Sequence, residues 1–123
     1  MKVSKKILKI KKLKLKKKLV CLTAYSKPIS KILDRYCDII LVGDSLATAF
    51  YGMANTKSIS LDTMINHAMA VKEAIHKSTF VVDMPFNTYR NIKEAKKNAK
   101  KIFKRTHCAV SYTHLTLPTI LLV

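Results

Sequence analysis

Short apolar runs alternate with amphipathic stretches along most of the chain. The apolar runs have the length of β-strands and lie at residues 19–24, 39–42 and 79–82. The amphipathic stretches carry apolar residues at helical spacing and lie at residues 28–36, 61–75 and 92–105. Ser26 and Ser60 precede the first two stretches, where a serine side chain is suited to cap a helix. The pattern predicts strand followed by helix three times, with a fourth strand beginning at about Cys108.

Such an alternation predicts an α/β fold, because strands joined by helices pair in parallel. Periodicity does not report how the sheet closes, so a (β/α)8 TIM barrel and an open doubly wound sheet both fit the pattern. A barrel takes roughly 250 residues, so this chain would hold about three and a half of eight βα units. In the barrel case the 123 residues are therefore the truncated N-terminal portion.

Positive charge is concentrated at the start of the chain. The sequence has 24 Lys and Arg against 7 Asp and Glu, a net charge of +17, and residues 1–18 hold ten lysines and no acid. A small basic nucleic-acid-binding protein is one interpretation, with binding that falls steeply as salt is added. The segment has no aromatic residue to stack on bases and no arginine for bidentate base contacts. We therefore interpret residues 1–18 as a solvated basic extension and expect no specific nucleic-acid partner.

Other composition features point to a cytoplasmic protein. The longest uncharged stretch, residues 111–123, is shorter than the roughly 18 to 20 apolar residues of a membrane span, and it contains a proline and a histidine. A peripheral membrane binder requires a cleaner amphipathic helix than residues 5–18 offer. Three cysteines without a CxxC pair are typical of reduced thiols rather than of a disulfide framework. We expect no membrane partner.

The composition changes abruptly at residue 111. Residues 111–123, SYTHLTLPTILLV, contain no Lys, Arg, Asp or Glu, although the segment before them is thick with lysine. A buried strand and turn would account for the change, but SYTHLTLPT also resembles a translated sequencing adapter. We interpret 111–123 as a non-native tail, and residues 19–110 as the partial barrel.

Two aspartates are the best candidates for chemistry. Asp44 and Asp83 are each the first charged residue after a predicted strand. In parallel α/β folds the carboxyl ends of the strands carry the active site, so the two carboxylates are expected to meet at one edge. Paired carboxylates suit Mg²⁺, and the hydroxyl of Ser45 is placed to contact a bound anion. The alternative is that both aspartates merely form turns after their strands.

Four segments carry a resemblance to a known family. In order and spacing they are LTAYSKPISKILD, IILVGDSL, SISLDTMINHAMAV and VVDMPFNTY. Together they resemble the N-terminal part of the ketopantoate hydroxymethyltransferase (3-methyl-2-oxobutanoate hydroxymethyltransferase) family, from about Val20 to Val110. GDSL alone is weak, but GDSL followed about forty residues later by DMPF after a strand is a specific pair. The resemblance therefore favours the barrel.

The resemblance implies an activity and its ligands. Members of the family transfer a hydroxymethyl group from 5,10-methylenetetrahydrofolate to 3-methyl-2-oxobutanoate in pantothenate biosynthesis, use Mg²⁺, and assemble into homo-oligomers, for which a decamer is expected. By motif, Asp44 and Asp83 resemble the metal-binding aspartates, and Asp44, Ser45 and Asp83 resemble residues that contact the 2-oxo acid. Another Mg²⁺-dependent 2-oxo-acid barrel, of the isocitrate lyase and phosphoenolpyruvate mutase type, is the related alternative.

The chain departs from the family pattern in its fourth strand. The pattern continues Ala-Val-Lys-(Leu or Ile)-Glu-Gly, with the lysine on the substrate and the glutamate on the metal, whereas Ser111 and Thr113 stand at those places here. The glutamate that serves as general base in the family lies beyond residue 123. We therefore assign no catalytic residue and expect the polypeptide as written to be inactive.

Overall fold

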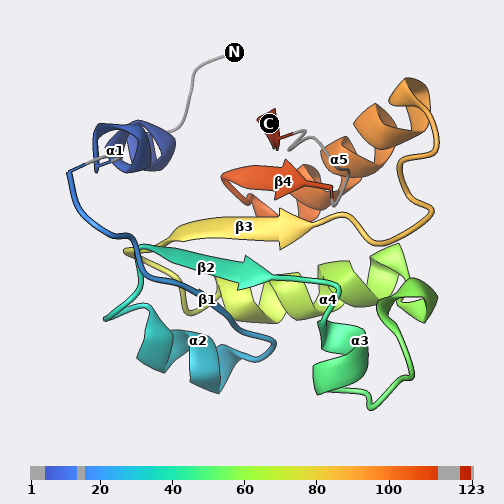
Figure 1. Cartoon of the computed structure of the whole chain (residues 1–123), viewed down its shortest axis with the longest axis horizontal. Helices are drawn as coiled ribbons and strands as arrows, with labels where there is room; N and C mark the ends of the chain where they lie inside the picture. Colours follow the sequence, from blue (N-terminus) through green and yellow to red (C-terminus); the bar gives the residue numbers. More distant parts are fainter. Residues whose placement is uncertain (1–4, 14–15, 114–119, 123) are drawn as a thin grey trace.

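The computed structural model describes residues 5–13, 16–113 and 120–122, and its elements follow the predicted alternation (Figure 1). The helices are α1 Lys5–Leu13, α2 Lys27–Leu33, α3 Leu46–Ala49, α4 Leu61–Lys72 and α5 Ile92–Thr106, with a 3₁₀ turn, η1, at Thr56–Ser58. The strands are β1 Cys21–Thr23, β2 Ile39–Val42, β3 Thr79–Asp83, β4 Val110–Tyr112 and β5 Ile120–Leu122.

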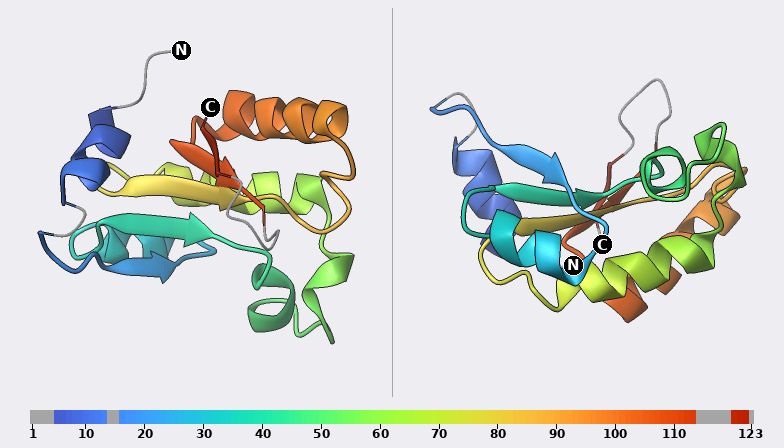
Figure 2. Two further views of the ribbon diagram at one scale, coloured as in Figure 1. Left: turned by 45° about the horizontal axis from the view of Figure 1, so that its top comes forward. Right: turned by 90° about the horizontal axis from the view of Figure 1, so that it is seen from below.

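The strands form one sheet in the order β1-β2-β3-β4-β5. The first four pair in parallel, and β5 runs antiparallel to β4. Figure 2 shows α2, α4 and α5 on the same face of this sheet, and no helix of the described residues covers the opposite face. A doubly wound sheet has helices on both faces and a point where the strand order reverses. The sequential order and the single helical layer are instead those of a (β/α)8 barrel, which confirms the predicted fold class.

The hydrophobic core lies between the sheet and its helices. Alternate residues of the central strands point toward α4 and are fully buried: Ile40, Val42, Phe80 and Val82. Met64, Ile65 and Ala68 supply the facing side of α4. The intervening residues Ile39, Leu41 and Val81 are only half-buried because they lie on the face without helices. The strands therefore carry two different faces, one of which is the inner wall of the barrel segment.

The predicted caps are present in part. The Ser60 side chain accepts a hydrogen bond from the backbone N–H of Thr63 at 3.1 Å and begins α4. Ser26 occupies the same position before α2, but its side chain makes no capping bond. The helix α2 ends at Leu33, earlier than the apolar pattern suggests, and the side chain of the next residue, Asp34, bonds outside the helix.

Asp34 ties α2 to the turn that leads into β3. Its buried carboxylate accepts hydrogen bonds from the backbone N–H groups of His76 (2.9 Å), Lys77 (3.0 and 3.1 Å) and Ser78 (2.8 Å). This clamp lies at the amino ends of the strands, opposite the edge where Asp44 and Asp83 lie.

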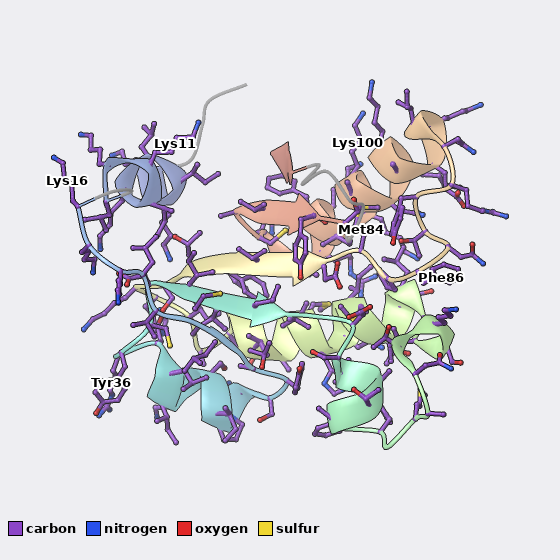
Figure 3. All side chains as sticks on the ribbon, in the orientation of Figure 1. Lys11, Lys16, Tyr36, Met84, Phe86 and Lys100 are labelled. Atoms are coloured by element: carbon purple, nitrogen blue, oxygen red, sulfur yellow. The ribbon has the colours of Figure 1, made fainter. Side chains whose placement is uncertain are left out.

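Part of the basic segment is a packed helix. Residues 5–13 form α1, which lies at the amino ends of the strands, with Lys11 on it (Figures 1 and 3). Ile7 is buried, and the Lys6 ammonium donates to the carbonyl oxygens of His76 at 3.0 Å and Ser78 at 2.8 Å. Burial, the largest effect, lowers the pKa of Lys6. Residues 5–13 are thus not wholly solvated, contrary to the expectation for this segment, because tertiary contacts select a helix where the apolar spacing was mixed.

The segment predicted to be a non-native tail contributes to the sheet. Ser111 and Tyr112 belong to β4, and Ile120–Leu122 form β5. Its residues 114–119 and 123 lie outside the described part of the chain. That residues 111–123 are foreign therefore stays a prediction.

Candidate active site

The two candidate aspartates lie side by side at the carboxyl edge of the sheet. Asp83 is the last residue of β3, and Asp44 follows β2 after one intervening glycine. The backbone N–H of Asp44 donates to Oδ2 of Asp83 at 3.1 Å. Asp83 is fully buried and Asp44 is half-buried. Parallel pairing of β2 with β3 brings the two residues together, although 39 positions separate them in sequence.

The negative charges of these carboxylates affect the pKa of two nearby tyrosines. Burial, and then the negative charges of Asp83 and Asp44, raise the pKa of both Tyr112 and Tyr89. Tyr112 is paired with Asp83 in the register of β3 and β4, and Tyr89 lies in the loop between β3 and α5. The phenols therefore stay protonated and neutral next to the aspartates.

Ser45 begins the short helix α3, directly after Asp44. Its side chain makes no capping bond to that helix. Instead its Oγ lies 2.6 Å from the hydroxyl oxygen of Tyr25, which lies in the loop after β1. The structure therefore brings all three predicted site residues, Asp44, Ser45 and Asp83, to one edge of the sheet.

Ser111 and Thr113 do not join this group. Ser111 pairs with Val82, a core residue, whereas Asp83 pairs with Tyr112, so Ser111 points to the opposite face of the sheet from Asp83. The side chains of Ser111 and Thr113 are buried, and their hydroxyls have no hydrogen-bond partner among the described residues. The residues at the family's lysine and glutamate positions thus add no ligand to the site.

The donor set at this edge fits a hard cation. The described residues contain no group of three or more His, Cys, Asp or Glu side chains placed to share a metal. Two carboxylates are nevertheless what Mg²⁺ often takes from a protein, because water and substrate oxygens complete its octahedral shell. The arrangement of Asp44 and Asp83 is compatible with that mode.

Several aromatic and polar residues on the segments that follow the strands and on α4 were not singled out from the sequence. They are Tyr25, Tyr51, His67 and Phe86. Figure 3 shows Phe86 beyond the carboxyl end of β3, and the ammonium of Lys57 lies 5.6 Å from the centre of its ring. Tyr25 lies in the segment LTAYSKPISKILD that carries the family resemblance, but the resemblance assigned it no role.

No helix within the described ranges is long and apolar enough to cross a membrane.

The sheet order, the single helical layer and the two aspartates at the carboxyl edge define a segment of a (β/α)-barrel protein.

The comparison with protein families narrows this class. The profile of ketopantoate hydroxymethyltransferase matches residues 4–112, so the chain belongs to that family. The match includes α1 and most of the lysine-rich start, which lies outside the span of the sequence resemblance from Val20 to Val110. It also includes Ser111 and Tyr112, the first residues of the predicted tail.

The curated relatives of this chain carry the name of the same enzyme. The chain is 54% identical over 106 residues to the 3-methyl-2-oxobutanoate hydroxymethyltransferase of Pelagibacter ubique, covering 86% of this chain and 41% of that protein. It is 50% identical over 91 residues to the Anaplasma marginale (strain Florida) enzyme, covering 74% and 33%. It is 48% identical over 93 residues to the Rhizobium etli enzyme, and the match covers 75% of this chain and 34% of that protein. The chain therefore spans less than half the length of these relatives.

Proposed function

We propose that this chain forms the keto-acid- and metal-binding part of an enzyme that transfers a hydroxymethyl group from 5,10-methylenetetrahydrofolate to 3-methyl-2-oxobutanoate, giving 2-dehydropantoate. The observation that carries the proposal is the contact between the N–H of Asp44 and Oδ2 of Asp83, which brings two acidic residues from neighbouring strands to one point. Membership of the hydroxymethyltransferase family supplies the reaction.

The residues have distinct tasks in this proposal. Asp44 and Asp83 would hold Mg²⁺ through carboxylate oxygens, and the hydroxyl of Ser45 would donate a hydrogen bond to the carboxylate of the 2-oxo acid. A bound magnesium ion supplies Lewis-acid withdrawal of electrons from the keto group, which favours loss of a proton from the adjacent carbon. The hydrogen bond from the N–H of Asp44 orients Oδ2 of Asp83.

Turnover requires more groups than this site presents. Ser111 and Thr113 lack the charge of the lysine and glutamate of the family pattern, and Ser111 lies on the other face of β4. We therefore expect the 123-residue chain to bind metal and oxo acid without completing the reaction. The isocitrate lyase type of barrel and a nucleic-acid-binding protein are not favoured, because the family match identifies a different protein class. A homo-oligomer and a cytoplasmic location belong to the same proposal.

The test uses Mn²⁺, a paramagnetic substitute for Mg²⁺ with the same preference for oxygen ligands. Electron paramagnetic resonance of the chain with Mn²⁺ should show bound metal whose spectrum changes when 3-methyl-2-oxobutanoate is added. Asp83→Asn should weaken Mn²⁺ binding by more than the roughly 10- to 100-fold that loss of an outer-shell partner costs.

Asp62→Asn is the matched control. Asp62 is exposed, and its carboxylate pairs with Lys101 on the helical side of the molecule. The substitution removes the same charge as Asp83→Asn. Because Asp62 lies away from the proposed site, the substitution should leave Mn²⁺ binding unchanged. Equal loss in both variants would mean that the metal is held by general charge, and the proposed site would be wrong.

A further inference from the structure

A chain of polar contacts runs from α4 to the candidate substrate residue Ser45. Nδ1 of His67 lies 2.7 Å from the carbonyl oxygen of Tyr25, and the Tyr25 hydroxyl lies 2.6 Å from Oγ of Ser45. On its other side, Nε2 of His67 lies 2.9 Å from the hydroxyl of Tyr51. Three elements that are distant in sequence, the loop after β1, the start of α3 and the middle of α4, are linked in this way.

The direction of the hydrogen bond between His67 and Tyr25 follows from the chemistry of its two atoms. A backbone carbonyl oxygen only accepts hydrogen bonds, so Nδ1 of His67 must carry the proton. In the neutral ring Nε2 then accepts from the hydroxyl of Tyr51. Edge-to-face contacts with Phe50 and Tyr51, with ring centres 5.1 and 5.7 Å away, hold the imidazole plane. His67 therefore has a fixed tautomer and a fixed orientation toward Tyr25.

The same reasoning sets the direction at Ser45. A substrate carboxylate only accepts hydrogen bonds, so Ser45 must donate its proton to bind one. Its oxygen is then an acceptor for Tyr25, whose hydroxyl must donate. Because Ser45 makes no capping bond to α3, its oxygen accepts no hydrogen bond from the first turn of that helix and can accept from Tyr25.

We propose that Tyr25 and His67 are positioning residues for the 2-oxo acid. His67 holds the Tyr25 backbone, Tyr25 donates to Ser45, and the Ser45 proton is thereby directed to the substrate carboxylate. This inference rests on the proposed function, because Ser45 meets a 2-oxo acid only there. In this arrangement each residue acts through the orientation of Ser45.

The test compares affinities by isothermal titration of the full chain with 3-methyl-2-oxobutanoate in the presence of Mg²⁺. Tyr25→Phe removes only the donor to Ser45, and His67→Phe removes the donor to Tyr25 while keeping a ring. Each should weaken binding by about tenfold, the typical effect of losing one hydrogen bond in a chain that ends on a charged group. His67→Asn should restore most of the affinity, since the asparagine amide places an N–H near the position of Nδ1.

Two readouts separate positioning from general damage. Mn²⁺ affinity without the oxo acid should stay at the wild-type value in Tyr25→Phe and His67→Phe, and long-range ¹H–¹⁵N spectra should show the proton of His67 on Nδ1. The control is His76→Asn, an exposed histidine at the amino ends of the strands, which should change neither affinity.

The outcomes distinguish the two proposals. If the unmodified chain binds no oxo acid, the proposed function and this inference both fail. If it binds and both Phe variants bind equally well, or if His67→Asn is as weak as His67→Phe, the positioning role alone is overturned.

Discussion

Asp34 shows how one buried carboxylate makes the stability of the fold depend on pH. Burial by itself raises its pKa, but the N–H groups of Ser78, His76 and Lys77 outweigh that effect and lower the pKa from 3.8 to about 2. Because the folded-state pKa is depressed, the clamp stabilises the fold fully above pH 3.8 and loses its contribution as the pH falls from there toward 2. The shift corresponds to about 2 kcal/mol.

We therefore expect Asp34→Asn to lower the free energy of unfolding at pH 7 and to flatten its dependence on pH below 4. Urea unfolding between pH 2 and 7 measures both effects. Glu73→Gln serves as control, because Glu73 pairs with Lys27 at the surface and both side chains are exposed. A pH profile for Asp34→Asn that is as steep as that of the unmodified chain would contradict the role of the clamp.

At this scale the sequence indicated the acidic pair but not its surroundings. Asp44 and Asp83 were predictable because a charged residue at the end of an apolar strand has a defined place in a parallel sheet. His67 and Tyr25 were not, since their contacts join residues 42 positions apart through the packing of α4 against the loop after β1. A histidine inside a helical pattern gives no sign of which carbonyl it meets.

The helices α2 and α4 both have a serine at the N-cap, but only one of the two serines caps its helix with a side-chain bond. Ser60 bonds the N–H of Thr63, whereas Ser26 makes no side-chain bond. Ser60→Ala should therefore reduce the free energy of unfolding by about 1 kcal/mol. Ser26→Ala should change it by less than about 0.5 kcal/mol, as expected of a substitution that removes no cap bond. Chemical denaturation of the two variants checks this, and equal losses would show that the Ser60 bond does not stabilise α4.

Elements with regular apolar spacing were predicted well, and those that depend on tertiary contacts were not. The strands β2 and β3 and the helices α4 and α5 match the predicted stretches within a few residues. The four-residue helix α3 was not predicted because it has too few residues to show a period. The helix α1 was missed because Ile7 and Lys6 gain their partners only when the sheet is present.

The arrangement of the whole molecule was the least visible in the sequence. Alternating strands and helices fit an open sheet as well as a barrel, and only the strand order and the side taken by the helices separate the two. Both depend on pairings between residues about 40 positions apart, such as Ile40 with Phe80. In the sequence it is the family resemblance, rather than periodicity, that favours the barrel.

The outer edge of β1 is exposed, which favours association of the chain with other copies of itself in solution. In a closed barrel the first strand pairs on both sides, whereas β1 here pairs only with β2 among the described strands. Its residues are exposed, including Leu22 at 47%. An unpaired apolar strand edge is a template for association with another chain. We expect the sedimentation coefficient to rise between about 1 and 100 μM protein, the range in which exposed strand edges associate.

Leu22→Lys should shift this association to higher concentration, because charged side chains protect strand edges. Ile92→Lys is the control: Ile92 is 74% exposed at the start of α5, so the variant adds the same charge away from β1. If general repulsion in a chain that already carries +17 governed association, both variants would behave alike. A difference between them identifies the β1 edge as the surface that associates, and a monomer at every concentration of the unmodified chain would contradict the prediction.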